Sequence, residues 1–459
     1  MYGGIASEEA AKTAHDFLEA MLGTTQLEYS PLAVVEDRLA PLYISISQNY
    51  LELVRAGLIT LSRGRISGIK GRTAVTTTVP IENIAAVVLA TGFDPSPSLG
   101  FLSPEILQTI QSSPDHPEVA TVLAFHDTYH PAIPGLGFVG FYRSPYWGVA
   151  EMQARFLTAL WSDPRPMSVN AALKEDNSLV EAAAMRGNAR TSQFPMGDYP
   201  FLMQEFGNAL DTHISPPLEP PLVVPGKHSG VALDLLTPAR YTRADITPEG
   251  QGESDKSLSQ VHADVRAALE GTRFVAAAVF RSLLGTWKLD RDITSKLPSH
   301  PSGHFSGTAN FLVRSKTLDG LQCASDPNSN LPTPSETQDD GLEYLYIEEG
   351  TFRATNGFSF TATRRYVYRY DEESDTLSVW FVKTDDALRA DYLFHNVEFD
   401  ALSGNGGGWR ATAGHLCIDD FYGVDYEFVF KAVNLEKWSV GYKVKGPQKD
   451  YTLKGTYTR

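Results

Sequence analysis

The sequence predicts an α/β region in the first half of the chain and an all-β up-and-down barrel of about ten strands in the second. The 459 residues exceed what one hydrophobic core usually organises. Helical periodicity and apolar runs alternate in the first half, whereas short alternating strands without intervening helices follow residue 285. We therefore predict domains at residues 1–225 and 275–459, joined by a linker and a helix at 226–274.

Composition and charge argue against several classes of function. Hydrophobic residues make up 42% and charged residues 20% of the chain, which is ordinary for a globular protein. The formal net charge is −16 and no run of Lys or Arg occurs, so we expect no nucleic-acid partner. No apolar run approaches the roughly 18 residues of a membrane span, and the start of the chain lacks a signal-peptide pattern. Only Cys323 and Cys417 are present, so we expect no disulfide framework, no metal and a cytoplasmic protein.

The first half alternates helix and strand signals. Helical spacing covers residues 7–22 and 44–57. Short strands are predicted next, at 58–62, 66–70 and 73–79. The run 81–93 (IENIAAVVLATGF) is continuously apolar, which is typical of a strand covered on both faces in a parallel sheet. It ends in Thr91 and Gly92, where the glycine lets the backbone approach a ligand at the edge of the sheet.

A GxGxxG pattern occurs at residues 135–140, within GLGFVGFYRSPYWGVAEMQAR. A dinucleotide-binding loop needs a strand before it and a helix that opens directly out of it. Here a proline precedes the first glycine, and the letters FYRSP separate the last glycine from any helix. We favour a buried strand at 138–142 and a helix from about 146 to 160, with a phosphate loop as the weaker alternative.

Three blocks in order resemble the C-terminal half of flavin-containing monooxygenases: residues 45–66, 87–95 (VVLATGFDP) and 140–155 (GFYRSPYWGVAEMQAR). The resemblance covers roughly residues 30–225 and implies FAD-dependent oxidoreductase chemistry. It also implies cofactor-binding roles for Gly140, Tyr146, Trp147, Gln153, Thr91 and Gly92. Packing of a buried strand–helix corner is the alternative interpretation of residues 140–153.

The two glycine-rich loops that anchor FAD and NADPH in that family do not occur in this sequence. The glycine run at 404–408 (GNGGG) lies between strand-like segments and is better interpreted as a hairpin loop. The sequence leaves FAD open as a cofactor although its anchor motifs are absent, and it argues against NADPH binding by this chain alone. A partner chain could supply a nucleotide-binding domain.

Two histidines in HDTYH, His126 and His130, have the i,i+4 spacing of some metal ligands. No third ligand is evident, and Pro131 follows directly. We therefore interpret this segment as a loop and expect no metal.

The linker combines stiff and polar sequence. Residues 215–226 (SPPLEPPLVVPG) are proline-rich and predict a stiff connection. Residues 244–257 are polar and acidic and predict flexibility. A helix is predicted at about 258–284.

Ten candidate strands follow, separated by Gly, Asp, Asn or Pro. They are 285–293, 303–313, 344–349, 358–370, 377–383, 392–399, 409–418, 422–431, 438–445 and 451–459. Strands in this number with no helix between them predict an up-and-down barrel. A barrel of this size can hold one small ligand.

Alternation along these strands places several ionisable side chains on the apolar, inward face. These are Arg291, Arg364, His395, His415 and Arg459. A buried charge must be paired or hydrogen-bonded, and few inward acids accompany these cations. We predict a cavity lined by Arg291, Arg364, Tyr366, Tyr368, His395, His415 and Tyr422.

Such a lining suits an apolar or oxygen-rich molecule whose carboxylate or enolate is held by Arg. In a catalytic variant, His395 is a general base and Arg364 stabilises an enolate. Structural ion pairs inside a rigid barrel are the alternative.

The barrel sequence also resembles known families. The GTW that opens the first strand and the terminal Arg459 resemble lipocalin and calycin barrels, which implies a structural cation–π contact between Trp287 and Arg459. More closely, six blocks in order resemble an uncharacterised family of lipocalin-like domains over residues 283–459: GTWKLDR, GHFSGTANF, FTATRRY, the FH at 394–395, GHLCIDDFY and VKGPQKDY. That resemblance implies a fold but no activity.

These observations support a flavin-monooxygenase-related protein fused to a small-molecule-binding barrel, which acts on or binds an apolar oxygenated metabolite in secondary metabolism. The alternative is a redox-silent barrel protein that binds, isomerises or cyclises an anionic or enolic metabolite without flavin. A structural or partner-binding module is a third hypothesis. Whether the chain is an enzyme stays open at this point.

Overall fold

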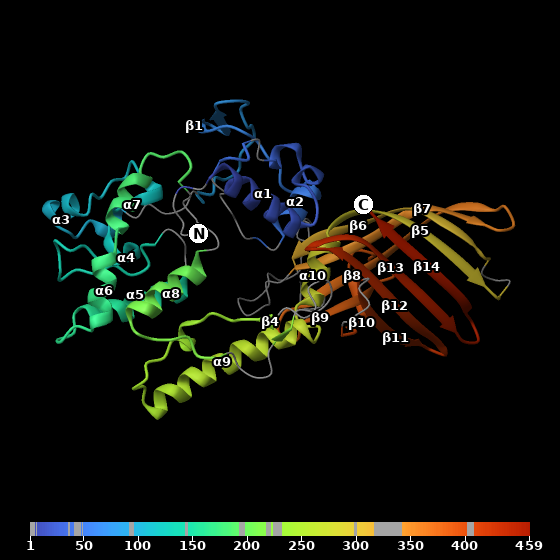
Figure 1. Ribbon diagram of the computed structural model, residues 1–459. Coiled ribbons are helices and arrows are strands. Elements are labelled where there is room, and N and C mark those ends of the chain that lie inside the picture. Colours follow the sequence, from blue (N-terminus) through green and yellow to red (C-terminus); the bar gives the residue numbers. More distant parts are fainter. Residues whose placement is uncertain are drawn as a thin grey trace.

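The computed structural model describes residues 5, 7–34, 37–40, 47, 49–90, 96–142, 146–191, 198–216, 222–223, 232–297, 301–315, 342–401 and 408–459. They form a helical N-terminal region and a β-barrel, and Figure 1 shows helices α1 (Glu8–Leu22) and α2 (Tyr50–Arg55) on the side of the N-terminal region that faces the barrel. None of the described helices is long and apolar enough to cross a membrane.

The second half is a closed barrel in which ten antiparallel strands follow one another in sequence order. The strands are β5 (Gly285–Ser295), β6 (Gly303–Ser315), β7 (Leu342–Ala354), β8 (Ser359–Asp371), β9 (Thr376–Val382), β10 (Ala390–Phe399), β11 (Trp409–Cys417), β12 (Asp420–Lys431), β13 (Asn434–Lys445) and β14 (Asp450–Thr458). Pairing of β14 with β5 closes the barrel. The predicted ten-strand up-and-down barrel is confirmed, with every strand at its predicted place to within a few residues.

The alternation along β5 shows why this sequence forms a barrel wall. Trp287, Leu289 and Arg291 are buried, whereas Lys288 between them is exposed. A strand with one apolar side must turn that side toward a core, and ten such strands enclose one. The resulting core continues over helix α10 (Val275–Leu283), which packs against one end of the barrel.

The N-terminal region is mostly helical. Its α-helices are α1 (Glu8–Leu22), α2 (Tyr50–Arg55), α3 (Pro104–Thr109), α4 (Ala124–Asp127), α5 (Trp147–Leu160), α6 (Met167–Glu175), α7 (Ser178–Met185), α8 (Tyr199–Ala209) and α9 (Pro248–Leu269). Short 3-10 turns and two small hairpins, β1 (Ile66–Lys70) with β2 (Thr73–Thr76) and β3 (Leu222–Val223) with β4 (Ala232–Leu233), complete it. Its main core lies between α5 and α8, where Met152, Phe156 and Phe206 are fully buried.

The expected strand at 81–93 is wrong for the residues that the structure describes. Ile81 forms an isolated bridge with Ala74, and residues 82–90 belong to no strand. Val88 and Leu89 are 86% and 85% exposed. The apolar run has the composition of a buried strand, but no described neighbouring strand pairs with it. The described N-terminal sheets are antiparallel hairpins, so the predicted parallel sheet is absent from the described residues.

Several predicted bounds of short strands and helices are also wrong. Residues 138–142 form no strand, although Phe138 and Tyr142 are buried as expected. Residues 58–62 are irregular, and the helix expected at 44–57 is described only at Tyr50–Arg55. The polar segment 244–257 is not flexible coil, because α9 begins at Pro248 with a Thr247 cap. The single helix expected at 258–284 is two helices, which break where Phe274 has φ +71°.

The N-terminal region packs against the closed end of the barrel. Leu53 and Ala56 of α2 contact the barrel core. Arg55 donates a hydrogen bond to Asn434 at the start of β13, with 3.0 Å between the atoms, and stacks on the ring of Tyr29. The two regions therefore share an interface although about 230 residues separate α2 from the first barrel strand.

Candidate ligand-binding site

The barrel encloses a cavity of about 650 Å³, within the range of small-molecule sites. Its walls are largely aromatic and include Phe305, Phe352, Phe358, Phe360, Phe381 and Phe394. Lining residues such as Pro301, Phe358 and Lys449 come from the turns at the end of the barrel opposite α10. The cavity therefore opens away from the N-terminal region.

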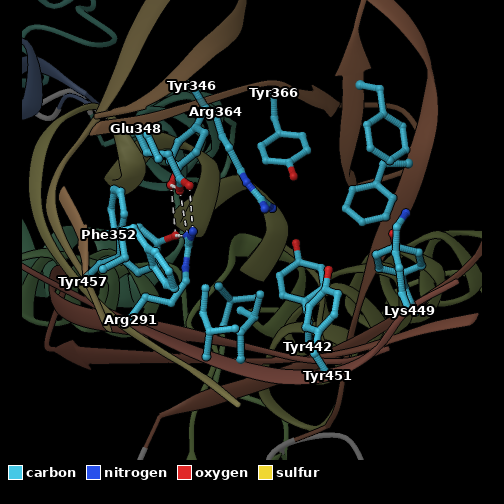
Figure 2. A pocket seen from close by; sticks show the side chains of 18 of the residues that line it. Arg291, Tyr346, Glu348, Phe352, Arg364, Tyr366, Tyr442, Lys449, Tyr451 and Tyr457 are labelled. Atoms are coloured by element: carbon cyan, nitrogen blue, oxygen red, sulfur yellow. Dashed lines mark hydrogen bonds and ion pairs between the residues drawn. The ribbon is translucent and has the colours of Figure 1, made fainter. Parts of the chain in front are cut away.

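A buried network occupies one side of this cavity, and Figure 2 shows it around Glu348. Arg291 and Glu348 form a bidentate ion pair with both N···O distances at 2.7 Å. Tyr346 donates to Glu348 at 2.6 Å, and Tyr457 lies 3.0 Å from Tyr346 and 3.1 Å from Arg291. Both carboxylate oxygens of Glu348 are therefore occupied by protein donors.

Electrostatics keep this network ionised. Burial raises the pKa of Glu348, but the hydrogen bonds and charge of Arg291 outweigh it and hold that pKa below its usual value. Burial, with the neighbouring Tyr457 and Glu348, raises the pKa of Tyr346 well above its usual value, so this phenol stays a neutral donor. Glu348 and Tyr457 thus occupy both terminal nitrogens of Arg291, and its Nε, which has no hydrogen-bond partner among the described residues, is buried and out of reach of a ligand in the cavity.

Arg364 is a different kind of cation. It lies on β8 directly opposite Glu348 in the register, and its guanidinium extends into the cavity in Figure 2. It forms no hydrogen bond or ion pair with any residue that the structure describes. The neighbouring Tyr366 raises the pKa of Arg364, burial lowers it, and Glu348 raises it further; the net shift is upward. Arg364 is therefore a permanent positive charge that is accessible from the cavity.

Three phenols accompany this guanidinium. Figure 2 shows the hydroxyl groups of Tyr366, Tyr442 and Tyr451 directed toward the middle of the cavity, where the guanidinium of Arg364 ends; Tyr442 and Tyr451 extend from the opposite wall. Burial raises the pKa of Tyr451 to about 12 and that of Tyr442 well above its usual value. Both phenols are therefore protonated near pH 7 and can donate hydrogen bonds. The arrangement favours a ligand that carries oxygen acceptors.

Five of the seven side chains predicted to line the cavity do so, namely Arg291, Arg364, Tyr366, Tyr368 and Tyr422. The sequence prediction missed other lining residues, including Tyr346, Glu348, Tyr442, Lys449, Tyr451 and Tyr457. Glu348 was within reach of sequence reasoning, because Tyr344, Tyr346 and Glu348 alternate along one predicted strand. That alternation places Glu348 on the inward face, where its carboxylate pairs with Arg291.

His395 lies in the barrel wall and does not line the cavity. Register shifts in β10 after Ala390 and after Leu393 interrupt its alternation, so Phe394 and His395 are both buried. The side chain of His395 is therefore buried, whereas Leu393 is exposed, and the predicted place of His395 in the cavity lining is wrong. The Nε2 atom of His395 lies 3.3 Å from the Tyr426 hydroxyl, and burial lowers the pKa of His395 to about 4.

His415 is also outside the cavity surface. Its ring packs edge-on against Phe394 with the ring centres 5.2 Å apart and lies beside Tyr422. Burial lowers the pKa of His415, while a hydrogen bond with the Phe394 backbone raises it; the net shift is downward. The structure thus separates both histidines from the space that Arg364 enters.

Trp287 and Arg459 close the other end of the barrel. The guanidinium carbon of Arg459 lies 4.0 Å from the centre of the buried Trp287 ring. The same guanidinium donates to the carbonyl groups of Ser282 and Leu284 at 2.6 Å each and to Glu52 at 2.8 Å. This is the contact that the lipocalin resemblance implies, extended by a carboxylate from α2.

The predicted flavin-facing residues surround the start of α5. Gln153 is fully buried, accepts a hydrogen bond from the Gly140 amide at 2.9 Å and donates one to the His126 carbonyl at 2.9 Å. Tyr146 stacks near Tyr142. Trp147, the first residue of α5, is 86% exposed. Gln153 therefore holds the corner together, whereas Trp147 is accessible. Thr91 and Gly92 lie outside the described residues.

The HDTYH segment has an unusual backbone. Phe125, His126 and Asp127 have φ of +43°, +55° and +63°, a conformation that non-glycine residues rarely adopt. The Asp176 carboxylate accepts the Phe125 amide at 2.9 Å and helps to fix this turn. Among the described residues no cluster of three or more potential ligands, around His130 or elsewhere, could hold a metal.

Comparisons with known proteins cover the barrel. Residues 283–459 match a family described as "Family of unknown function (DUF6314)". A solved structure titled "Crystal Structure of Rv2717c from M. tuberculosis" has 11% sequence identity and a TM-score of 0.17, over 40% of this chain and 96% of that chain. No curated protein matches. The fold and the site thus describe a barrel with an internal cavity, and these comparisons show no flavin-monooxygenase relationship.

Proposed function

We propose that the barrel binds one small, largely apolar molecule and holds its anionic oxygen group at Arg364. The observation that carries the proposal is the contrast between the two cavity arginines. Arg291 is neutralised by Glu348 at 2.7 Å, whereas Arg364 has no partner among the described residues. A guanidinium in a partly enclosed site gains most from a carboxylate, which can accept two parallel hydrogen bonds, whereas the single oxygen of an enolate accepts a charge-assisted hydrogen bond.

The surrounding groups support the same ligand class. The aromatic walls favour an apolar body, and the phenols of Tyr442 and Tyr451 supply further donors. Glu348 is the only carboxylate among the described lining residues, and Arg291 already occupies it. A cationic ligand would find no free counter-charge there.

A matched pair of fluorescent probes tests this proposal. 1-Anilinonaphthalene-8-sulfonate carries an anion, and N-phenyl-1-naphthylamine has the same aromatic body without it. We expect both to bind, and Arg364→Gln to weaken the anionic probe about tenfold or more with little effect on the neutral one. Lys443→Gln, at an exposed position of β13, is the control. Equal affinity of the anionic probe for wild type and Arg364→Gln would contradict the proposal.

The placement of His395 favours binding over catalysis. A general base must reach the proton that it removes, and His395 is buried in the wall next to Tyr426. The geometry therefore does not support the hypothesis that His395 is a general base. It still supports a role for Arg364 in binding an oxyanion. We accordingly place ligand binding first.

A second proposal concerns the N-terminal region. The segment around Val88 and Leu89 has the composition of a buried strand but is exposed, and Trp147 is exposed at the start of α5. We infer that a partner chain supplies the nucleotide-binding sheet that covers this segment, and that FAD is held only in the assembled complex. This would retain flavin oxygenase chemistry without phosphate loops in this chain.

Visible absorbance tests the second proposal. We expect the isolated chain to be colourless and not to retain added FAD, and the complex isolated gently from the source cells to show flavin bands. Val88→Asp should remove the flavin from the complex, whereas Lys443→Gln should not. A native complex without flavin would refute the proposal and leave the barrel assignment intact.

A further inference from the structure

A second cation stands at the opening of the cavity. Lys449 comes from the turn between β13 and β14 and lines the cavity. Its ammonium group donates a hydrogen bond of 2.7 Å to the hydroxyl of Tyr422 and lies 5.4 Å from the centre of that ring. This hydrogen bond is the largest contribution to the raised pKa of Lys449, so the side chain is charged at neutral pH.

The carboxylate of Asp420 lies near Lys449 but mainly accepts hydrogen bonds from backbone amides. Asp420 is buried, and its Oδ1 atom accepts hydrogen bonds from the amides of Gln448 and Lys449 at 3.1 and 3.2 Å. Its other oxygen is 4.0 Å from the ammonium nitrogen of Lys449. Asp420 thus fixes the turn that carries Lys449 and offsets its charge only partly.

The cavity therefore has two separate positive positions. Its described lining includes the cations Arg291, Arg364 and Lys449 but the single carboxylate of Glu348, which Arg291 occupies. Figure 2 shows Lys449 on the far side of the cavity from the Arg291 network, with Arg364 between them. These two cations are notable in a chain whose net charge is −16, because Arg364 has no described partner and Asp420 offsets the charge of Lys449 only partly.

We propose that the natural ligand is a dianion, with an apolar body and an oxyanion at each end. The first oxyanion binds Arg364, so the inference rests on the proposed function. The second binds Lys449 with the Tyr422 hydroxyl. A fork-shaped guanidinium suits a planar carboxylate, and the compact ammonium accepts any oxyanion. The apolar body lies along the aromatic wall between the two cations.

A series of α,ω-dicarboxylic acids and the matching monocarboxylic acids, from eight to fourteen carbons, tests this inference by displacement of N-phenyl-1-naphthylamine. We expect one diacid to bind about tenfold more tightly than the monoacid of equal length. Lys449→Met should abolish this advantage and leave monoacid affinity within about twofold of wild type. Arg364→Gln should weaken monoacids and diacids alike.

The outcomes separate the two proposals. If monoacids bind through Arg364 but no diacid binds better, the dianion inference fails and the proposed function stands. If neither the monoacids nor the anionic probe depend on Arg364, the proposed function itself fails. A Lys449→Met variant that loses monoacids and diacids equally would show that Lys449 only maintains the opening, which overturns the second site. Thermal unfolding of each variant confirms that the barrel is intact.

Discussion

Similar apolar sequences are buried in the barrel but exposed in the N-terminal region. In the barrel, each strand has two neighbours, and the apolar side of β5 packs inside. In the N-terminal region, the equally apolar residues 84–90 form no strand and are largely exposed. The difference shows that an apolar pattern specifies a strand only where partner strands exist. Neighbours in a meander are adjacent in sequence, whereas those of a parallel sheet must come from distant segments.

The largest expected effect tests the barrel interior. Arg291→Met leaves the carboxylate of Glu348 buried with Tyr346 as its remaining hydrogen-bond donor. Breaking a buried ion pair in this way costs about 3–5 kcal/mol of unfolding free energy. Urea unfolding followed by tryptophan fluorescence measures it.

The double variant Arg291→Met/Glu348→Leu is the matched control, because it removes both charges. We expect it to recover most of the lost stability. A single variant that costs less than about 1 kcal/mol would mean that the pair is solvated rather than buried.

Acidification should weaken both regions through one histidine in each. Burial lowers the pKa of His395 in the barrel and of His126 in the N-terminal region to about 4. The folded state then binds fewer protons than the unfolded state between that pKa and about 6.5. The contribution of each histidine is therefore full above about pH 6.5 and falls by about 1.4 kcal/mol per pH unit down to about pH 4, which is roughly 3 kcal/mol for each histidine.

The variants His395→Gln and His126→Asn separate the two regions. Each variant should reduce the slope of unfolding free energy against pH for its own region. The reduction should correspond to about one proton fewer taken up on unfolding. Chemical denaturation at several pH values between 4 and 7 provides the slope. An unchanged slope in either variant would mean that the histidine is accessible to solvent.

A smaller effect is expected at the interface between the regions. Arg459→Ala removes the cation–π contact with Trp287 and the hydrogen bond to Glu52. We expect a loss of about 2 kcal/mol in unfolding free energy. Arg459→Lys, which keeps the charge but not the planar fork, should recover only part of it. Full recovery by lysine would show that charge alone matters there.

The smallest effect is expected where the apolar segment is exposed. Val88→Asp should change the unfolding free energy of the isolated chain by no more than about 0.5 kcal/mol. Met152→Ala, in the fully buried core of α5, is the contrasting control and should cost about 2–5 kcal/mol. A large loss from Val88→Asp would show that this segment is packed in solution.

The fold of the barrel was predictable because its signal is local. Each strand is recognised by its own alternation and by the turn that follows, and its partner is the next strand in sequence. In the N-terminal region the prediction succeeded best at α1 and α5, where the helical pattern is clear, and at the short strand β1. The prediction of a parallel sheet was wrong for the described residues because it rested on one apolar segment, residues 81–93, for which the sequence offered no partner strands.

The site was predicted in part. Alternation placed Arg291, Arg364 and Tyr366 correctly on the cavity wall. It also placed His395 on the cavity wall, whereas the structure buries this side chain against Tyr426 and outside the cavity lining; no turn residue marks the register shifts inside β10. Lys449 was missed because it belongs to a turn, where alternation gives no direction.

The contacts at the closed end of the barrel limit how the barrel could be transferred into another protein by gene fusion. Leu53 and Ala56 cover part of the barrel core, and Glu52 binds the terminal Arg459. A gene fusion that carried only residues 275–459 into another protein would leave that apolar surface without its cover. The unit that could be transferred intact is therefore discontinuous in sequence, because it consists of the barrel together with the short helix α2. A fusion cut only at residue 275 would separate the barrel from the helix that covers its closed end.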